Sequence, residues 1–224
     1  MTRITTIGGG SGQFSLLSGL RDLPGAEITA VVAMTDSGGS TGRLRDELGA
    51  LPPGDVLKCI VALSPQRESA RRLLLKRFAG NRRLAGHSAG NMLLTMLSRY
   101  SGSFAEGVAA LAEILEARGR ILPVTTDNAT LVAELTDGTR IFGEGAIDVP
   151  CDIQREKIRE VFLLPKDSGT ISVHPPVLDA IAGADAVIVG PGDLYTSIIP
   201  NLIVPGVGEA LANTEARLIY VLNI

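Results

Sequence analysis

Four polar segments of this 224-residue sequence combine glycine with side chains that bind phosphate, sugar or metal. Glycine leaves the backbone bare, so N–H groups at the start of a helix can approach an anion closely. Hydroxyl and carboxylate groups bind sugars and divalent cations, and guanidinium groups bind phosphate. These residue types predict a site for a phosphate-bearing small molecule. The segments span residues 8–12, 35–45, 86–91 and 190–197.

The first segment, Gly-Gly-Gly-Ser-Gly, follows a β-rich run. It departs from the dinucleotide fingerprint G-x-G-x-x-G because Gln13 stands where the last glycine belongs. It is not a phosphate-binding Walker loop either, since the sequence contains no Gly-Lys-Ser/Thr. A tight turn between strand and helix is the structural alternative to phosphate binding. The candidate binding residues are Gly9, Gly10, Ser11 and Gly12.

The second segment, TDSGGSTGRLR, has the densest set of polar groups. Asp36 comes just after an expected strand and is suited to hold Mg²⁺ or a ribose hydroxyl, whereas Arg43 is suited to phosphate. Asp55 stands further on, where it either caps the next helix or contacts the ligand. The candidate binding residues are Thr35, Asp36, Ser37, Gly38, Gly39, Ser40, Arg43 and Asp55, with Asp36 as the candidate metal ligand.

The third segment, Gly-His-Ser-Ala-Gly, matches the G-x-S-x-G nucleophile elbow of serine hydrolases. That elbow requires a buried strand directly before it, and residues 79–85 do not have a strand pattern. A catalytic triad would also have to recruit His174 and an acid such as Asp148. We therefore interpret His87, Ser88 and Asn91 as polar groups that open a helix over 89–100 and face the ligand.

The fourth segment, GPGDLYTS, follows another apolar run and is expected to contact a sugar or phosphate. The structural alternative is that these residues only connect a strand to the following helix. The candidate binding residues are Gly190, Pro191, Gly192, Asp193, Leu194, Thr196, Ser197 and Asn201.

These segments must be positioned by an α/β fold. Apolar β-rich runs at 2–7, 27–34 and 184–189 precede the first, second and fourth segments, and helical spacing lies between them. The pattern predicts a Rossmann-like, three-layer, doubly wound and mostly parallel sheet within one nucleotide-binding domain, residues 1–224. Asp137-Gly138 adds a small β-hairpin insertion. Because parallel strands end at the same sheet edge, we expect the segments to meet in one crevice.

The composition excludes several other classes of protein. At 45% hydrophobic and 20% charged residues, the chain can bury a full core, and its 4% aromatic content makes that core aliphatic. A net charge of −3 argues against nucleic-acid binding by bulk electrostatics. The two cysteines form no metal spacing, and the sequence has neither a signal peptide nor an apolar run long enough to span a membrane. We expect a cytoplasmic protein.

Five stretches, taken in order, resemble the gluconeogenesis factor family of the CofD-like superfamily, which is related to 2-phospho-L-lactate transferase. They are GGGSG, TDSGGSTGRLRDELGALPPGD, LAGHSAGN, GRILPVTTDNATLVAELTDG and VGPGDLYTSIIPNLIVPGV. The resemblance implies a Rossmann-like cytoplasmic protein that binds a UDP-sugar and regulates carbon metabolism and cell shape. In the transferase branch, it implies Mg²⁺-dependent transfer of a phospholactyl group from a guanosine diphospho donor.

Three departures from the family pattern bear on this choice. The transferase branch carries Gly-Asp-Arg-Asp where this chain has Gly86-His87-Ser88, which argues against transfer to a deazaflavin. Many members have two adjacent aspartates where this chain has Asp36-Ser37, which weakens a two-carboxylate metal site. Members also usually continue well beyond the strand that ends near Ile224, so the chain is expected to lack the C-terminal part usual in the family.

Three functional hypotheses follow. The first is a regulatory protein that binds a nucleotide or nucleotide sugar without turnover. The second is a Mg²⁺-dependent transferase of phosphorus-containing groups. The third is a structural partner of a wall or division complex. The sequence leaves the base, the sugar, a homodimer and any catalysis open.

Overall fold

The structure is a computed structural model that describes residues 1–37, 51–79, 84–149, 155–166 and 169–223. Its strands are β1 (Thr2–Gly8), β2 (Ala26–Val32), β3 (Arg120–Pro123), β4 (Ala129–Leu135), β5 (Arg140–Phe142), β6 (Ile158–Pro165), β7 (Ala186–Val189) and β8 (Arg217–Tyr220). The α-helices are α1 (Gly10–Leu20), α3 (Gly54–Leu63), α4 (Arg67–Ala70), α5 (Ala89–Tyr100), α6 (Phe104–Ile114), α7 (Glu144–Asp148), α8 (Pro175–Ala182), α9 (Ile199–Leu202) and α10 (Val207–Asn213). Two π-helical turns are η1 (Arg71–Leu75) and η2 (Leu194–Ile198).

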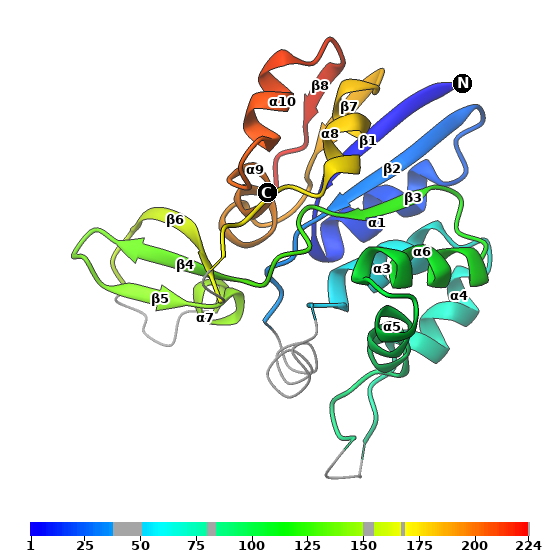
Figure 1. The fold of residues 1–224 in the computed structure, drawn as a ribbon, viewed down its shortest axis with the longest axis horizontal. Coiled ribbons are helices and arrows are strands. Elements are labelled where there is room, and N and C mark those ends of the chain that lie inside the picture. The colour runs from blue at the N-terminus through cyan, green and yellow to red at the C-terminus, as the bar shows by residue number, and fades with distance from the viewer. Residues whose placement is uncertain (38–50, 80–83, 150–154, 167–168, 224) are drawn as a thin grey trace.

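The main sheet has five strands in the order β3-β2-β1-β7-β8, and every neighbouring pair is parallel (Figure 1). Strands are added on one side from β1 through β3 and on the other side from β7 to β8. The direction of winding therefore reverses between β1 and β7, which is the switch point where such sheets bind ligands. The predicted doubly wound parallel sheet is confirmed.

Two consecutive threonines show how helices cover both faces of this sheet. Side chains of neighbouring strand residues point to opposite faces. The Thr5 hydroxyl donates to the carbonyl of Ala180 in α8 at 2.8 Å, whereas the Thr6 hydroxyl accepts from the Gln13 side chain in α1 at 3.2 Å. Helices α1 and α8 thus lie on opposite faces, and the three predicted layers are present.

Helix α1 begins at Gly10, inside the first glycine segment. Gln13 is fully buried, and its Nε2 also donates to the carbonyl of Val31 at 2.9 Å. The amide thereby joins α1 to β1 and β2 at the sheet centre. Gln13 is a packing residue, which explains why a glycine is not needed at this position.

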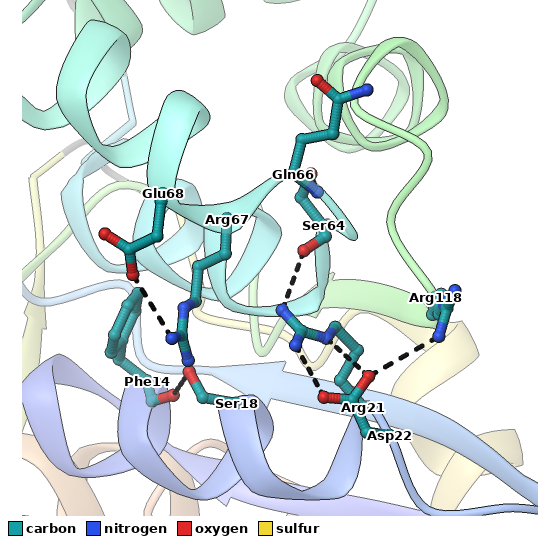
Figure 2. Close-up of polar contacts among 9 residues, drawn as sticks. All are labelled: Phe14, Ser18, Arg21, Asp22, Ser64, Gln66, Arg67, Glu68 and Arg118. Atoms are coloured by element: carbon teal, nitrogen blue, oxygen red, sulfur yellow. Dashed lines mark hydrogen bonds and ion pairs between the residues drawn. The ribbon is translucent and has the colours of Figure 1, made fainter.

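The other end of α1 is held by a network of charged side chains (Figure 2). Arg21 donates to the carbonyl of Ser64, directly after α3, at 3.0 Å, and pairs with Asp22 at 2.6 Å. Asp22 also pairs with Arg118 at 3.5 Å. These contacts bind the carboxyl end of α1 to the end of α3, so that the two helices cover the sheet as a unit.

The expected hairpin is part of a larger element. Strands β4 and β5 pair antiparallel around Asp137-Gly138, as predicted, but β6 pairs along the other side of β4. The insertion is therefore a three-stranded sheet in the order β5-β4-β6, which stands beside the main body in Figure 1. The Asp-Gly turn predicts only the pairing of the two strands that it connects, whereas β6 lies more than twenty residues after β4 in the sequence.

None of the helices within the described part of the chain has the length and apolar character needed to cross a membrane.

Candidate functional site

The first and fourth glycine segments meet at the switch point. They follow β1 and β7, which are neighbours in the sheet. Asn201 of α9 is fully buried, and its Nδ2 donates to the carbonyl of Gly8 at 3.1 Å and to that of Ser197 at 2.8 Å. Its Oδ1 is buried without a hydrogen-bond partner. Asn201 thus ties the end of β1 to η2.

Asp55 reaches the amino end of α1. Its Oδ2 accepts from the backbone N–H of Gly10 at 2.8 Å, and its Oδ1 accepts from the Lys58 ammonium at 2.9 Å. The helix cap at α3 is Pro53, so the capping alternative for Asp55 is wrong. The Asp55 carboxylate thus occupies the place at the amino end of α1 where the Gly10 N–H group can bind an anion. A methyl group added to Gly9 would stand 2.9 Å from the same oxygen, which explains the glycine there.

The first helical turn of α1 also packs against the loop after β7. A Cβ on Gly12 would lie 2.3 Å from the Pro191 carbonyl oxygen, too close for any side chain. At Gly10, a Cβ would lie 3.6 Å from the Ser197 hydroxyl, and φ is +64°. The backbone of α1 therefore directly contacts the backbone of the loop after β7, and the Ser197 side chain lies beside this contact. Ser11 is exposed on the outer side of this turn.

Asp193 has a structural task that the sequence pattern left open. Its Oδ1 accepts from the backbone N–H groups of Tyr195 and Thr196 at 2.9 and 2.8 Å and from the Thr196 hydroxyl at 2.9 Å. The carboxylate caps η2, as the strand-to-helix alternative predicts. Thr196 and Ser197 are buried, whereas Leu194 remains 44% exposed.

The second segment contacts a residue that the sequence analysis missed. The backbone N–H of Ser37 donates to Glu144 Oε2, and the Ser37 hydroxyl accepts from the Gly145 N–H, both at 3.2 Å. Glu144 begins α7, which lies next to the three-stranded sheet, and only its position after the Asp137-Gly138 hairpin could have drawn attention to it. Thr35 is buried nearby. The candidate residues Gly38, Gly39, Ser40 and Arg43 lie outside the described residues.

Four titratable groups, Asp36, Asp55, Lys58 and Glu144, lie close enough together to shift one another's pKa. Burial, followed by the negative charges of Asp36 and Asp55, raises the pKa of Glu144 to about 8, so this carboxyl is protonated at neutral pH. Burial alone would lower the pKa of Lys58, but the charge of Asp55 and its hydrogen bond to Lys58, with smaller contributions from Asp36 and from Glu144 once it ionises, outweigh burial and raise the pKa. Lys58 is a second residue that sequence reasoning missed, although it lies one helical turn after Asp55.

These carboxyl groups do not fit a metal site as they stand. No group of three or more His, Cys, Asp or Glu side chains within the described ranges could hold a metal ion. A divalent cation would have to replace Lys58 at Asp55 and remove the proton from Glu144. The assignment of Asp36 as a Mg²⁺ ligand stays a prediction.

The third segment opens a helix, as expected. Ser88 caps α5 by accepting from the Asn91 N–H at 3.2 Å, and the described residues 84–86 form a turn rather than a strand. The nucleophile-elbow alternative therefore lacks its strand. A Cβ on Gly90 would lie 2.4 Å from Leu57 Cδ2, so the start of α5 packs closely on α3 two residues beyond Asp55. His87 and Asn91 are buried at this junction.

A separate cavity lies at the edge of the main sheet. It has a volume of about 650 Å³ and lies between α6, β3 and the start of α8. Glu113, Arg120 and His174 are among its lining residues, and burial together with the Arg120 charge lowers the pKa of His174. No residue of the four glycine segments, as far as the structure describes them, lines this cavity.

Comparison with known sequences identifies the family. The profile of the family described as 2-phospho-L-lactate transferase CofD matches residues 4–224. This chain belongs to that family. A gluconeogenesis factor from Halalkalibacterium halodurans is 42% identical over 221 residues, and one from Bacillus subtilis is 39% identical over 222 residues. Each alignment covers 99% of this chain, but only 66% and 68% of the respective relative.

Solved structures agree with this family assignment. A crystal structure of a protein from Bacillus halodurans superposes with a TM-score of 0.92 at 41% identity and covers the whole of this chain. A second crystal structure of the Bacillus halodurans protein, described as a member of the UPF0052 family, gives the same TM-score and identity. The chain spans about two thirds of the length of these relatives.

Proposed function

We propose that this chain is a regulatory protein of the gluconeogenesis factor type that binds a nucleotide sugar, a UDP-sugar, in the crevice between β1 and β7. One observation carries the proposal: the bare amide of Gly10, at the amino end of α1 and at the switch point of the sheet, already binds an oxyanion, the Asp55 carboxylate, at 2.8 Å. A diphosphate requires the same kind of donor.

The arrangement of these residues suggests roles for the first, second and fourth segments. The residues from Gly9 to Gly12 would hold the diphosphate, with Asp55 and Lys58 setting the local charge. Asp36 would contact ribose, and the loop that leads to Ser197 would close over the ligand. The regulated processes would be carbon metabolism, in keeping with the name of the relatives, and cell shape, which the family resemblance implies.

Titration calorimetry with UDP-N-acetylglucosamine, UDP-glucose, GDP and UMP tests this proposal. We expect saturable binding of a UDP-sugar in the absence of Mg²⁺, with an unchanged ligand recovered afterwards. Binding should also raise the melting temperature of the protein. If the folded protein binds none of these nucleotides, the proposal is wrong.

The family description favours a second candidate, a Mg²⁺-dependent transferase of phospholactyl-type groups. It predicts product formation from a nucleotide-diphospho donor and loss of that product in Asp36→Asn. Binding that needs no magnesium and gives no product would exclude the transferase and leave the regulatory role.

A further inference from the structure

Positive charge is concentrated in one part of this chain. Residues 66–100 contain eight of the 21 lysine and arginine residues but only one of the 24 acidic residues, Glu68. The net charge of this part is therefore +7, whereas the rest of the chain carries −10. Such an asymmetry indicates a surface for an anionic partner, which the overall charge of −3 conceals.

Three cations of this part have no carboxylate beside them. Arg71, Arg72 and Lys76 lie in η1 or directly after it, and all three side chains are exposed. No carboxylate among the described residues forms an ion pair with any of the three, whereas Arg67 in α4 pairs with Glu68 at 3.3 Å. The positive charge of η1 is therefore available to a partner outside the chain.

Large apolar side chains are exposed on the same elements. Leu73, which follows the two arginines of η1, is 72% exposed. On α5, Leu93, Met96 and Tyr100 recur at helical spacing and share one face, and Met96 and Tyr100 are 54% and 85% exposed. Leu94 is fully buried on the other side of α5, so the helix already has a packed face. The exposed apolar side chains mark an interaction surface.

These side chains belong to neighbouring elements. A Cβ on Gly90, in the first turn of α5, would lie 2.9 Å from the Leu74 carbonyl oxygen in η1. Just after η1, Arg77 forms a β-bridge with Ser88, the cap of α5. In Figure 1, α4 and α5 lie on the opposite side of the main body from β8 and α10. We call this region the basic–apolar surface, and it consists of Arg71, Arg72, Leu73, Lys76, Met96 and Tyr100.

We propose that the basic–apolar surface binds an anionic membrane surface. Headgroup phosphates attract arginine and lysine, while exposed apolar side chains enter the boundary between headgroups and acyl chains. A nucleic acid would attract the cations but would leave Leu73 and Met96 in water. A symmetric contact with a second copy of the chain would bring like charges together, which is unfavourable. Only a bilayer matches both the charge and the apolar character without requiring a shaped groove.

Co-sedimentation with lipid vesicles tests the proposal. The folded chain should bind vesicles that contain about one third phosphatidylglycerol, and it should bind pure phosphatidylcholine vesicles at least about tenfold more weakly. Raising the salt concentration from about 0.05 to about 0.5 M should release most of the protein, because salt screens the attraction. Equal binding to the two kinds of vesicle, or binding to neither, would overturn the proposal.

Two double substitutions separate this surface from the net charge of the protein. Arg72→Glu with Lys76→Glu should weaken vesicle binding at least about tenfold. Lys157→Glu with Arg217→Glu makes the same change in net charge at exposed positions on other elements, and it should weaken binding less than about threefold. All four side chains are exposed, so both proteins should keep the melting temperature of the wild type within a few degrees. Equal losses of binding in the two variants would contradict the proposal.

Apolar substitutions distinguish a membrane from other polyanions. Leu73→Ser with Met96→Ser keeps every cation, and it should weaken vesicle binding at least about threefold while leaving the binding of polyglutamate and of double-stranded RNA unchanged. Leu164→Ser, at a position of β6 that is 46% exposed, is the matched control and should leave vesicle binding unchanged. Tighter binding of polyglutamate or RNA than of the vesicles would show that the partner is not a membrane. No nucleotide takes part in these experiments, so their outcome is independent of the proposed function.

Discussion

The two ends of helix α1 are built on different principles. At the carboxyl end, Arg21 and Asp22 hold α1 to its neighbours through side-chain contacts (Figure 2). At the amino end, backbone meets backbone, and Gly12 leaves no space for a methyl group. The carboxyl end of α1 shows that side chains alone can hold a helix in place, without glycine at the contact. Close contacts require glycine at Gly9 and Gly12, and the same glycines leave the backbone N–H groups open to the ligand that we propose.

The largest effect is expected at the amino end. Gly12→Ala forces a Cβ to within 2.3 Å of the Pro191 carbonyl oxygen unless the backbone moves. Overpacking of this kind costs about 1–3 kcal/mol, and the displaced loop should weaken UDP-sugar binding at least about tenfold. Chemical denaturation and calorimetry measure the two effects. Unchanged stability would mean that α1 and the loop after β7 do not touch.

The next test uses pH to compare two carboxyl groups, Glu144, which interacts with the charge of Asp55 near the amino end of α1, and Asp22 at the carboxyl end. Glu144 has a folded-state pKa of about 8, above its ordinary value of 4.5, so its contribution to stability falls as the pH rises from about 4.5 to 8. Glu144→Gln should remove this dependence and stabilise the protein at pH 8 by more than about 1 kcal/mol. Asp22 has a lowered pKa because it accepts hydrogen bonds from Arg21, so its contribution is lost only in acid. Melting curves of the wild-type protein and of Glu144→Gln from pH 5 to 9 measure this difference. Parallel curves for the two proteins would show that the Glu144 carboxyl is already ionised at neutral pH, which would contradict its raised pKa.

Arg21→Ala tests the carboxyl end. It removes the charged donor from the Ser64 carbonyl, and we expect a loss of about 1–2 kcal/mol in the free energy of unfolding. Nucleotide affinity should not change, because the substituted end lies at the far end of the helix from the crevice. A loss of affinity comparable to that of Gly12→Ala would abolish the distinction between the two ends.

The smallest effect is expected in the middle of the helix. A Cβ on Gly19 has no atom within 4 Å, so Gly19→Ala should stabilise the protein by about 0.5–1 kcal/mol through helix propensity alone. This variant is also the matched control for Gly12→Ala, since both place alanine in α1. Destabilisation by Gly19→Ala would indicate that α1 tolerates no substitution at all.

Much of the fold could be predicted from local sequence. Apolar runs followed by glycine locate the strands and the sheet edge where β1 and β7 end, and Asp137-Gly138 locates the hairpin. The pairing of β6 with β4 could not be predicted, because it joins strands that are distant in sequence. Nor could the exposure of β8, whose apolar sequence indicates cover on both faces.

The site was predicted less completely than the fold. Glycine is visible in the sequence, and the structure shows that a Cβ at Gly9 or Gly12 would meet a neighbouring group, whereas ligand binding by these residues stays a prediction. The contact of Asp55 with Gly10 depends on how α3 packs beside α1, and the pKa of Glu144 depends on burial by elements far apart in the chain. Asp193 Oδ1 caps η2, a structural role that only the geometry reveals, and the predicted contact of Asp193 with the ligand stays a prediction.

The most direct test of the central claim is a titration of the isotope-labelled protein with UDP-N-acetylglucosamine, followed by the amide resonances in solution NMR. The claim predicts saturable shifts at the amides of Gly9, Gly10 and Ser197, with the amides of Gly19 and Arg21 unmoved. Saturable shifts confined to the cavity between α6 and β3, or no shifts from any UDP-sugar, would contradict it.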